Sequence, residues 1–231
     1  MFSLASAFAI LAAAAVAVFL SGPGRPPFRE EIDRFAALDK AQPPPPCEVL
    51  FVGDSSIRLW TTLAGDMAPL AVINRGFGGS QIPHINRYFG RIVRPYRPKA
   101  IVFYAGENDL ASGKTPNVVF AHFERFMRLK TKALGETPVY FISVNPSKAL
   151  FSQLATQREF NAKVEKLSKG RNDLAYVDVA TPMMEGGRPK DGIYVGDGLH
   201  MNAKGYAIWK QVVGDALKAG VVDRLPCPPK G

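Results

Sequence analysis

The chain has 231 residues, of which 47% are hydrophobic and 21% are charged. This balance excludes a disordered chain and predicts one globular domain with a sizeable core. The formal net charge of +9 suits an anionic lipid surface or an acidic polymer, but no nucleic-acid motif accompanies it, so we expect no nucleic-acid partner. Part of the excess is concentrated in one stretch, and a solvated helix face with the loop after it is the simpler explanation for it: Arg87, Arg91, Arg94, Arg97 and Lys99.

Residues 1–22 form an apolar segment in which Phe2 to Leu20 carry no charge. This length is about enough to cross the hydrocarbon core of a bilayer as a helix. We expect an uncleaved signal anchor or a cleaved signal peptide, and either one brings the chain to a membrane. Arg25 and Arg29 favour a cytoplasmic body by the positive-inside rule, whereas an N-terminal apolar segment ahead of a soluble body usually serves export. We expect an extracytoplasmic, periplasmic-type body that is membrane-anchored or secreted.

Residues 23–46 are expected to form a proline-rich linker with one short helix. The apolar residues of Phe28 to Ala41 have helical spacing, and the run Pro43 to Pro46 ends the pattern. The folded body is therefore expected to span residues 47–231.

Within that body, short apolar runs alternate with amphipathic stretches. Five runs are expected to be buried strands: Val49–Val52, Ala71–Ile73, Ala100–Tyr104, Val139–Ser143 and Ala175–Val177. Three stretches have clear helical periodicity: Asn117–Leu134, Gln153–Leu167 and Tyr206–Leu217. Strand–helix alternation predicts an α/β protein, a flavodoxin-like three-layer α/β/α sandwich with a five-stranded parallel sheet, preceded by the N-terminal apolar helix. Ligands bind such sheets at the carboxyl ends of the strands.

The residues directly after the first three strands carry the candidate chemistry. The first strand runs into Gly53-Asp54-Ser55, where a tight turn can expose the Ser55 hydroxyl, although this triplet could simply cap a helix. The second runs into a glycine-rich turn containing Gly79, whose backbone N–H can approach a ligand closely. The third is followed by Asn108, a neutral amide donor, between Glu107 and Asp109. Both acids must point away if Asn108 stabilises negative charge.

A further pair, Asp197 and His200, follows the last strand. An Asp three residues before a His can bring its carboxylate to Nδ1 and hold the tautomer in which Nε2 accepts a proton. A metal half-site would need more ligands, and the other histidines, His84 and His122, lie in amphipathic segments without partner spacing. The residues therefore do not favour a metal site.

At these four blocks the sequence resembles the SGNH hydrolases, also called the GDSL-type lipase/acylhydrolase family. The resemblance covers Glu48 to Leu217, with Ser56 in place of the leucine of the family's four-letter name. It implies a carboxylic ester hydrolase in which Ser55 is the nucleophile, His200 the general base and Asp197 its orienting carboxylate. It also implies an oxyanion hole made by the N–H groups of Ser55 and Gly79 and the side chain of Asn108. The resemblance further implies a covalent acyl-enzyme route that needs no metal and no organic cofactor.

The substrate is expected to be a short-chain acyl or acetyl ester of a small molecule, glycan or lipid, since no long apolar run is available to line an acyl tunnel. Asn145 and Tyr194 are candidate substrate-binding residues on the neighbouring loops. Two alternatives stay open: an acyltransferase that uses the same serine, and a non-catalytic glycan- or lipid-binding module on the same fold.

The two cysteines, Cys47 and Cys227, are a candidate disulfide. Cys47 precedes the first strand at the bottom of the sheet, and the helix after His200 returns the chain to that end. The two thiols can therefore meet, and an oxidising compartment would favour a bridge.

Overall fold

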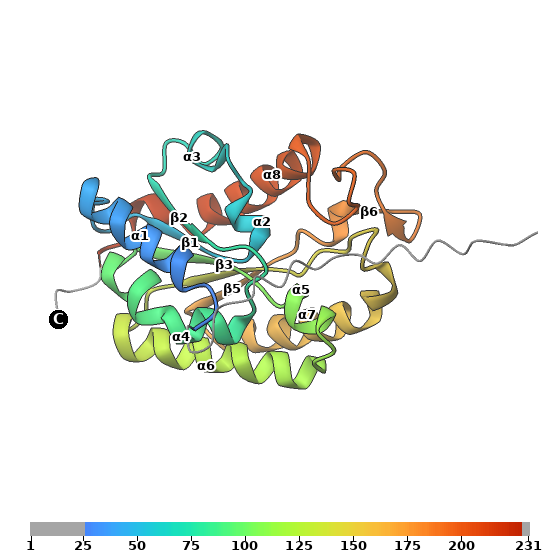
Figure 1. Cartoon of the computed structure of the whole chain (residues 1–231), viewed down its shortest axis with the longest axis horizontal. Helices are drawn as coiled ribbons and strands as arrows, with labels where there is room; N and C mark the ends of the chain where they lie inside the picture. Colours follow the sequence, from blue (N-terminus) through green and yellow to red (C-terminus); the bar gives the residue numbers. More distant parts are fainter. Residues whose placement is uncertain (1–25, 228–231) are drawn as a thin grey trace, which may run out of the picture.

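The computed structural model describes residues 26–227 of the chain, and in it a central parallel sheet has helices on both faces (Figure 1). The sheet has the strand order β2-β1-β3-β4-β5. Its strands are β1 (Val49–Gly53), β2 (Val72–Gly76), β3 (Ala100–Tyr104), β4 (Val139–Ile142) and β5 (Leu174–Val177). The predicted α/β/α sandwich is confirmed for the described residues, and the five predicted strands are the five strands of this sheet. The predicted N-terminal apolar helix lies outside the described residues.

Helices cover the two faces of the sheet as separate layers. The helices on one side are α1 (Arg29–Ala41), α4 (Ile82–Ile92), α6 (Pro116–Leu134) and α7 (Leu154–Ser168), with the short α5 (Glu107–Ala111) beside α7. Those on the other are α2 (Ser55–Arg58), α3 (Leu63–Asp66) and α8 (Ala203–Ala219). A small hairpin, β6 (Met184–Glu185) with β7 (Arg188–Pro189), lies near the N-terminal end of α8.

The strand sequences explain the two cores. Successive side chains of a strand point to opposite faces, so a strand buried on both faces is apolar throughout. In β1, Leu50 and Val52 enter the core beneath α4 and α6, whereas Val49 and Phe51 enter the core beneath α8. The continuous apolar run of β1 is therefore the consequence of helices on both sides of the sheet.

Strand β2 forms one edge of the sheet, and its own side chains cap that edge. The Ala71 carbonyl and the Phe77 N–H form hydrogen bonds with β1. Because alternate residues of a strand face the same neighbour, the backbone groups of Asn74 and Gly76 face away from β1. The Asn74 carbonyl accepts from Arg75 Nη1 (2.7 Å), and the Gly76 N–H donates to Asn74 Oδ1 (2.9 Å). These bonds leave fewer free groups for pairing with another strand.

Helix α1 belongs to the packed body, although the sequence predicted that the body would begin at Cys47. Ile32 of α1 is buried, and Asp39 forms an ion pair with Arg75 of β2. The Arg75 guanidinium also lies over the Phe35 ring, 5.0 Å from its centroid. The weak helical pattern of this segment underestimates its packing because a cation–π contact and an ion pair anchor it beside its few apolar residues.

Cys47 and Cys227 are joined by a disulfide, with their Cα atoms 5.2 Å apart. The bridge therefore joins the chain just before β1 to the segment after α8. These are the two cysteines that the sequence analysis gave as a candidate disulfide.

A second polar anchor lies between the buried Lys130 of α6 and Asp173, which also pairs with Arg171. Burial opposes the charged carboxylate, but the hydrogen bonds from Arg171 and Lys130 outweigh it and lower the pKa of Asp173 to about 2. This ion pair holds α6 to the loop that leads into β5.

None of the helices within residues 26–227 has the length and apolar character needed to cross a bilayer. The predicted signal anchor or signal peptide, residues 1–22, lies outside the described residues.

Candidate active site

The turn between β1 and α2 presents Ser55 at the carboxyl end of the sheet. Asp54 caps α2 because its Oδ1 accepts from the Ser56 N–H (2.9 Å), which makes Ser55 the first residue of the helix. Gly53 permits this sharp exit from the strand, since a Cβ there would lie 2.0 Å from the carbonyl oxygen of Tyr104. The sequence Gly-Asp-Ser thus supplies a close backbone approach, a cap and a half-buried hydroxyl in three consecutive residues.

The position of α2 also depends on Gly76 at the end of β2. A Cβ on Gly76 would lie 2.3 Å from the Arg58 N and 2.8 Å from atoms of Ile57. Both are parts of α2 that cannot move without displacing the helix. The absence of a side chain at Gly76 therefore sets how closely Ser55 approaches the neighbouring loop.

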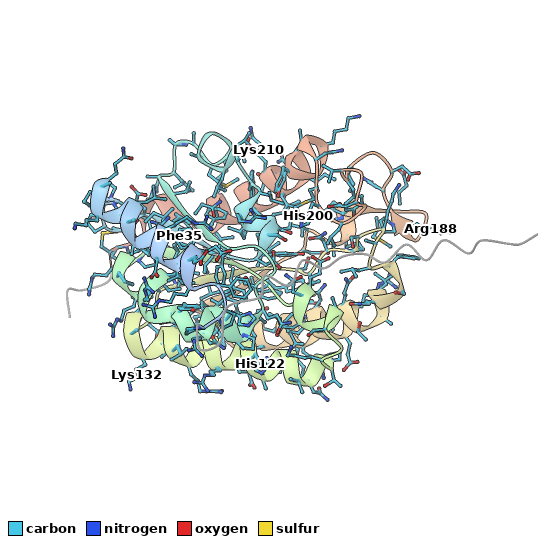
Figure 2. All side chains as sticks on the ribbon, viewed as in Figure 1. Phe35, His122, Lys132, Arg188, His200 and Lys210 are labelled. Atoms are coloured by element: carbon cyan, nitrogen blue, oxygen red, sulfur yellow. A yellow bond between two sulfur atoms is a disulfide. The ribbon has the colours of Figure 1, made fainter. Side chains whose placement is uncertain are left out.

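Ser55, His200 and Asp197 form one hydrogen-bonded chain. His200 Nε2 lies 3.0 Å from Ser55 Oγ, and His200 Nδ1 lies 2.6 Å from Asp197 Oδ2. The other carboxylate oxygen of Asp197 accepts from the backbone N–H groups of Leu199 (2.8 Å) and His200 (2.9 Å). In Figure 2, His200 lies beside the short helix α2. The sheet therefore brings together residues 145 positions apart in the sequence.

The carboxylate of Asp197 is held in its charged form. Partial burial opposes that form, but hydrogen bonds from the His200 side chain and from two backbone N–H groups outweigh it and lower the pKa of Asp197. A charged acceptor at Nδ1 favours the tautomer with a proton on Nδ1 and a free lone pair on Nε2. That lone pair faces the Ser55 hydroxyl, so the arrangement can remove a proton from Ser55.

Asn108 lies between the loop after β2 and the turn before α2. Its Nδ2 donates to the Ser80 carbonyl (3.1 Å) and to Asp54 Oδ2 (3.4 Å). Gly79 precedes Ser80 in a turn and has a φ of 73°, a left-handed conformation that favours glycine. The structure thus places Asn108 against both Ser80, the neighbour of Gly79, and Asp54, the neighbour of Ser55.

Three buried acids surround Asn108: Asp54, Glu107 and Asp109. Burial, with a smaller contribution from the nearby Asp109 carboxylate, raises the pKa of Asp54 to about 7. Burial likewise raises the pKa of Glu107 well above its usual range and raises that of Asp109. Because burial favours the neutral form of each acid, the negative charge close to Asn108 is reduced.

Asp109 also has a structural contact that the sequence did not reveal. Its Oδ2 accepts from the Ile82 N–H (2.9 Å) at the start of α4, and Gln81 Nε2 donates to the Asn108 carbonyl (3.3 Å). The loop with Gly79 and the loop with Asn108 are therefore bonded to each other. In the sequence, the only sign of this contact is that an acid, Asp109, directly follows the candidate amide donor Asn108.

The candidate substrate residues Asn145 and Tyr194 are buried and bonded within the protein. Asn145 Oδ1 accepts from the Tyr104 hydroxyl (2.7 Å), and the Tyr194 hydroxyl donates to the Pro146 carbonyl (2.6 Å). These bonds brace the loop after β4 against β3 and against the segment before Asp197. Local sequence does not distinguish such bracing from ligand binding.

Within residues 26–227, no group of three or more His, Cys, Asp or Glu side chains is arranged to hold a metal ion. His84 and His122 lie on α4 and α6 and are partly buried.

Comparisons with known proteins found a matching family model and solved structures of similar fold. The model of the GDSL-like Lipase/Acylhydrolase family matches residues 48–208. A GDSL-like lipase from Bacteroides thetaiotaomicron shares 22% sequence identity, with 82% of this chain and 98% of that chain covered at a TM-score of 0.71. A carbohydrate esterase family 3 protein from Talaromyces cellulolyticus shares 16% identity, with 78% and 100% covered at a TM-score of 0.62. These two structures show similarity of fold. The search of curated proteins found no match.

Proposed function

Because the chain belongs to the GDSL-like lipase/acylhydrolase family, we propose that it is a serine ester hydrolase that forms an acyl-enzyme on Ser55. The observation that carries this proposal is the unbroken contact from Asp197 through His200 to the Ser55 hydroxyl, with 3.0 Å between His200 Nε2 and Ser55 Oγ. Such a series of hydrogen-bonded side chains is the arrangement that activates a weak nucleophile at neutral pH.

In the first half of the reaction, Ser55 Oγ attacks the ester carbonyl carbon while its proton moves to His200 Nε2. The carbonyl π electrons move to the oxygen and give a tetrahedral oxyanion. When this intermediate collapses, the bond to the leaving alcohol breaks and His200 returns its proton to that oxygen. Asp197 stays charged throughout and stabilises the imidazolium.

In the second half, water takes the place of the alcohol. His200 accepts a proton from water as the water oxygen attacks the acyl carbon, and the Ser55 oxygen leaves and recovers its proton from His200. The free acid and the free serine are restored, so each turnover consumes one water and one ester.

The oxyanion is proposed to bind the N–H groups of Ser55 and Gly79 and the Asn108 amide. Ser55 begins α2, Gly79 adopts the left-handed turn conformation, and Asn108 lies against their neighbours Asp54 and Ser80. A donor of this kind typically contributes about 2.7–4 kcal/mol to the stability of the transition state.

We propose short acyl groups, acetyl above all, on a glycan or a lipid as the substrate. The likeness to a carbohydrate esterase fold is compatible with such an ester. We also propose an extracytoplasmic body that residues 1–22 anchor or export. The Cys47–Cys227 disulfide supports this location because disulfides persist in oxidising compartments. A C-terminal reporter that is active only outside the cytoplasm should therefore be active, and an inactive reporter would contradict the location.

The proposed reaction is tested by Ser55→Ala. Wild type should hydrolyse 4-nitrophenyl acetate and react with a fluorophosphonate probe, and Ser55→Ala should do neither. Ser152→Ala, a change of the same size at an exposed serine after β4, is the matched control and should keep both activities. Equal hydrolysis by wild type and Ser55→Ala would overturn the proposal.

A further inference from the structure

Arg58 is an exposed cation that shares a helix turn with the proposed nucleophile. Ser55 and Arg58 are three residues apart on α2, a spacing that puts two side chains on the same helix face with their Cβ atoms about 5–6 Å apart. Arg58 is exposed to solvent. Its side chain therefore leaves α2 on the same helix face as Ser55.

The Arg58 guanidinium lies against the glycine-rich loop after β2. A Cβ on Gly78 would lie 2.9 Å from Nε and Nη2 of Arg58 and 3.1 Å from its Cζ. Glycine at this position thus makes room for the planar group. Gly78 precedes Gly79, so the charge is held next to a proposed oxyanion donor as well as near Ser55.

Arg58 also borders a cavity of about 380 Å³ between α1, α2 and the edge strand β2. Phe35, Trp60, Thr61 and Asn74 are among its lining residues. The wall thus combines aromatic and aliphatic surface, the latter from Leu63, Ala64 and Val72, with hydroxyl and amide groups and one guanidinium. Among the described residues, no carboxylate forms an ion pair with Arg58 that would neutralise it.

We propose that Arg58 binds a carboxylate on the alcohol part of the ester, so that the substrate is an acylated acidic saccharide. This inference rests on the proposed function, since the ester must first be cleaved at Ser55. A guanidinium forms two parallel hydrogen bonds with a carboxylate, which gives the contact direction as well as charge. The contact would hold the sugar beside Arg58, with its acyl group directed along the shared face of α2 towards Ser55.

Two further observations favour a saccharide over a phospholipid. The cavity lies at the small end of ligand sites, which are about 300–1,000 Å³, and its lining mixes polar, aromatic and aliphatic residues. A lysophospholipid would need a long apolar surface for its chain. The net charge of +9 would also steer an acidic polymer towards the protein.

The test uses the purified protein and two esters that differ in one group. One is a methyl uronoside with a single O-acetyl group, and the other is the matching methyl hexoside with the acetyl at the same position. Wild type should have a higher kcat/KM for the uronoside. Charge-assisted hydrogen bonds are worth about 1.5–3 kcal/mol, so the preference should be about 10- to 100-fold and should lie mainly in KM.

In Arg58→Gln this preference should fall to near unity, and Arg58→Lys should keep part of it because lysine supplies the charge without the planar fork. Arg128→Gln removes the same charge from an exposed position on α6 and should keep the wild-type preference. Free uronate should inhibit wild type better than the neutral hexose, and Arg58→Gln should lose this difference.

The inference is overturned if Arg58→Gln keeps the preference, or if wild type shows none. It is also overturned if Arg58 discriminates only between acetyl esters of glycerol phosphate and glycerol, because the charge then serves a phosphate. In each of these cases wild type still cleaves 4-nitrophenyl acetate and Ser55→Ala does not, so the proposed function stands. Loss of all ester cleavage in wild type would instead refute the proposed function.

Discussion

Replacement of Asn108 by alanine tests the oxyanion hole with little change elsewhere. The side chain has two N–H bonds in the structure, one to the Ser80 carbonyl at 3.1 Å and a longer one to Asp54 Oδ2 at 3.4 Å. A substrate oxyanion would draw the N–H from the weaker, longer bond. The amide is therefore already oriented, and the exchange gives up little.

The expected loss of kcat follows from the lengths of these two hydrogen bonds. Removal of one oxyanion donor costs about 2.7–4 kcal/mol, which is about 10²- to 10³-fold in kcat. Since the 3.4 Å bond to Asp54 must be released, we expect the loss of kcat in Asn108→Ala to lie towards the lower end of this range, about 100-fold. KM should change little because the contact strengthens only in the transition state.

The assay is steady-state hydrolysis of 4-nitrophenyl acetate together with thermal unfolding. The lost bond to Ser80 should lower the free energy of unfolding by about 1 kcal/mol, so folding is preserved. Fluorophosphonate labelling of Ser55 should remain detectable. A loss of less than about threefold in kcat, or an effect confined to KM, would refute the role assigned to Asn108.

Three other predictions concern the scaffold. Gly76→Ala should lower kcat more than tenfold because its Cβ would meet the α2 backbone at 2.3 Å, whereas Gly65→Ala, with open space around it, should behave as wild type in the same assay. Serine at both bridge cysteines should lower the free energy of unfolding by about 2–5 kcal/mol with little effect on kcat, and an unchanged melting temperature would contradict the bridge. The folded pKa of Asp173, about 2, lies below its usual value of 3.8, so its stabilisation of about 2 kcal/mol should be present above about pH 4 and lost as the pH falls towards 2. Urea unfolding of Asp173→Asn should accordingly show a larger deficit at pH 7 than at pH 2.

Buried strands were predictable because strands covered on both faces are apolar throughout. The bounds of β2 were not predictable from the apolar pattern. The sequence pattern ends at Ile73, whereas the strand continues through Asn74 and Arg75 to Gly76. These polar residues belong to an edge strand, where they cap the outer backbone groups and pair with α1. Apolar periodicity carries no information about such capping.

The same distinction applies to the site. Ser55, Asn108, Asp197 and His200 follow strands in the sequence, and the parallel sheet brings them to one edge. The spacing of a motif does not show which side chains are turned inward. Asn145 follows β4 in the same manner, yet it is bonded to Tyr104 in the interior. That outcome depends on a tyrosine 41 positions away, which local sequence does not reveal.

The central claim is that Ser55 carries the acyl group during turnover. Acid quenching during hydrolysis of an acetyl ester, followed by mass spectrometry of the peptide that contains Ser55, measures this directly. The account predicts one acetyl group on Ser55 in wild type and none in Ser55→Ala, which should also be inactive. An acetyl group on another residue, or continued hydrolysis by Ser55→Ala, would contradict it.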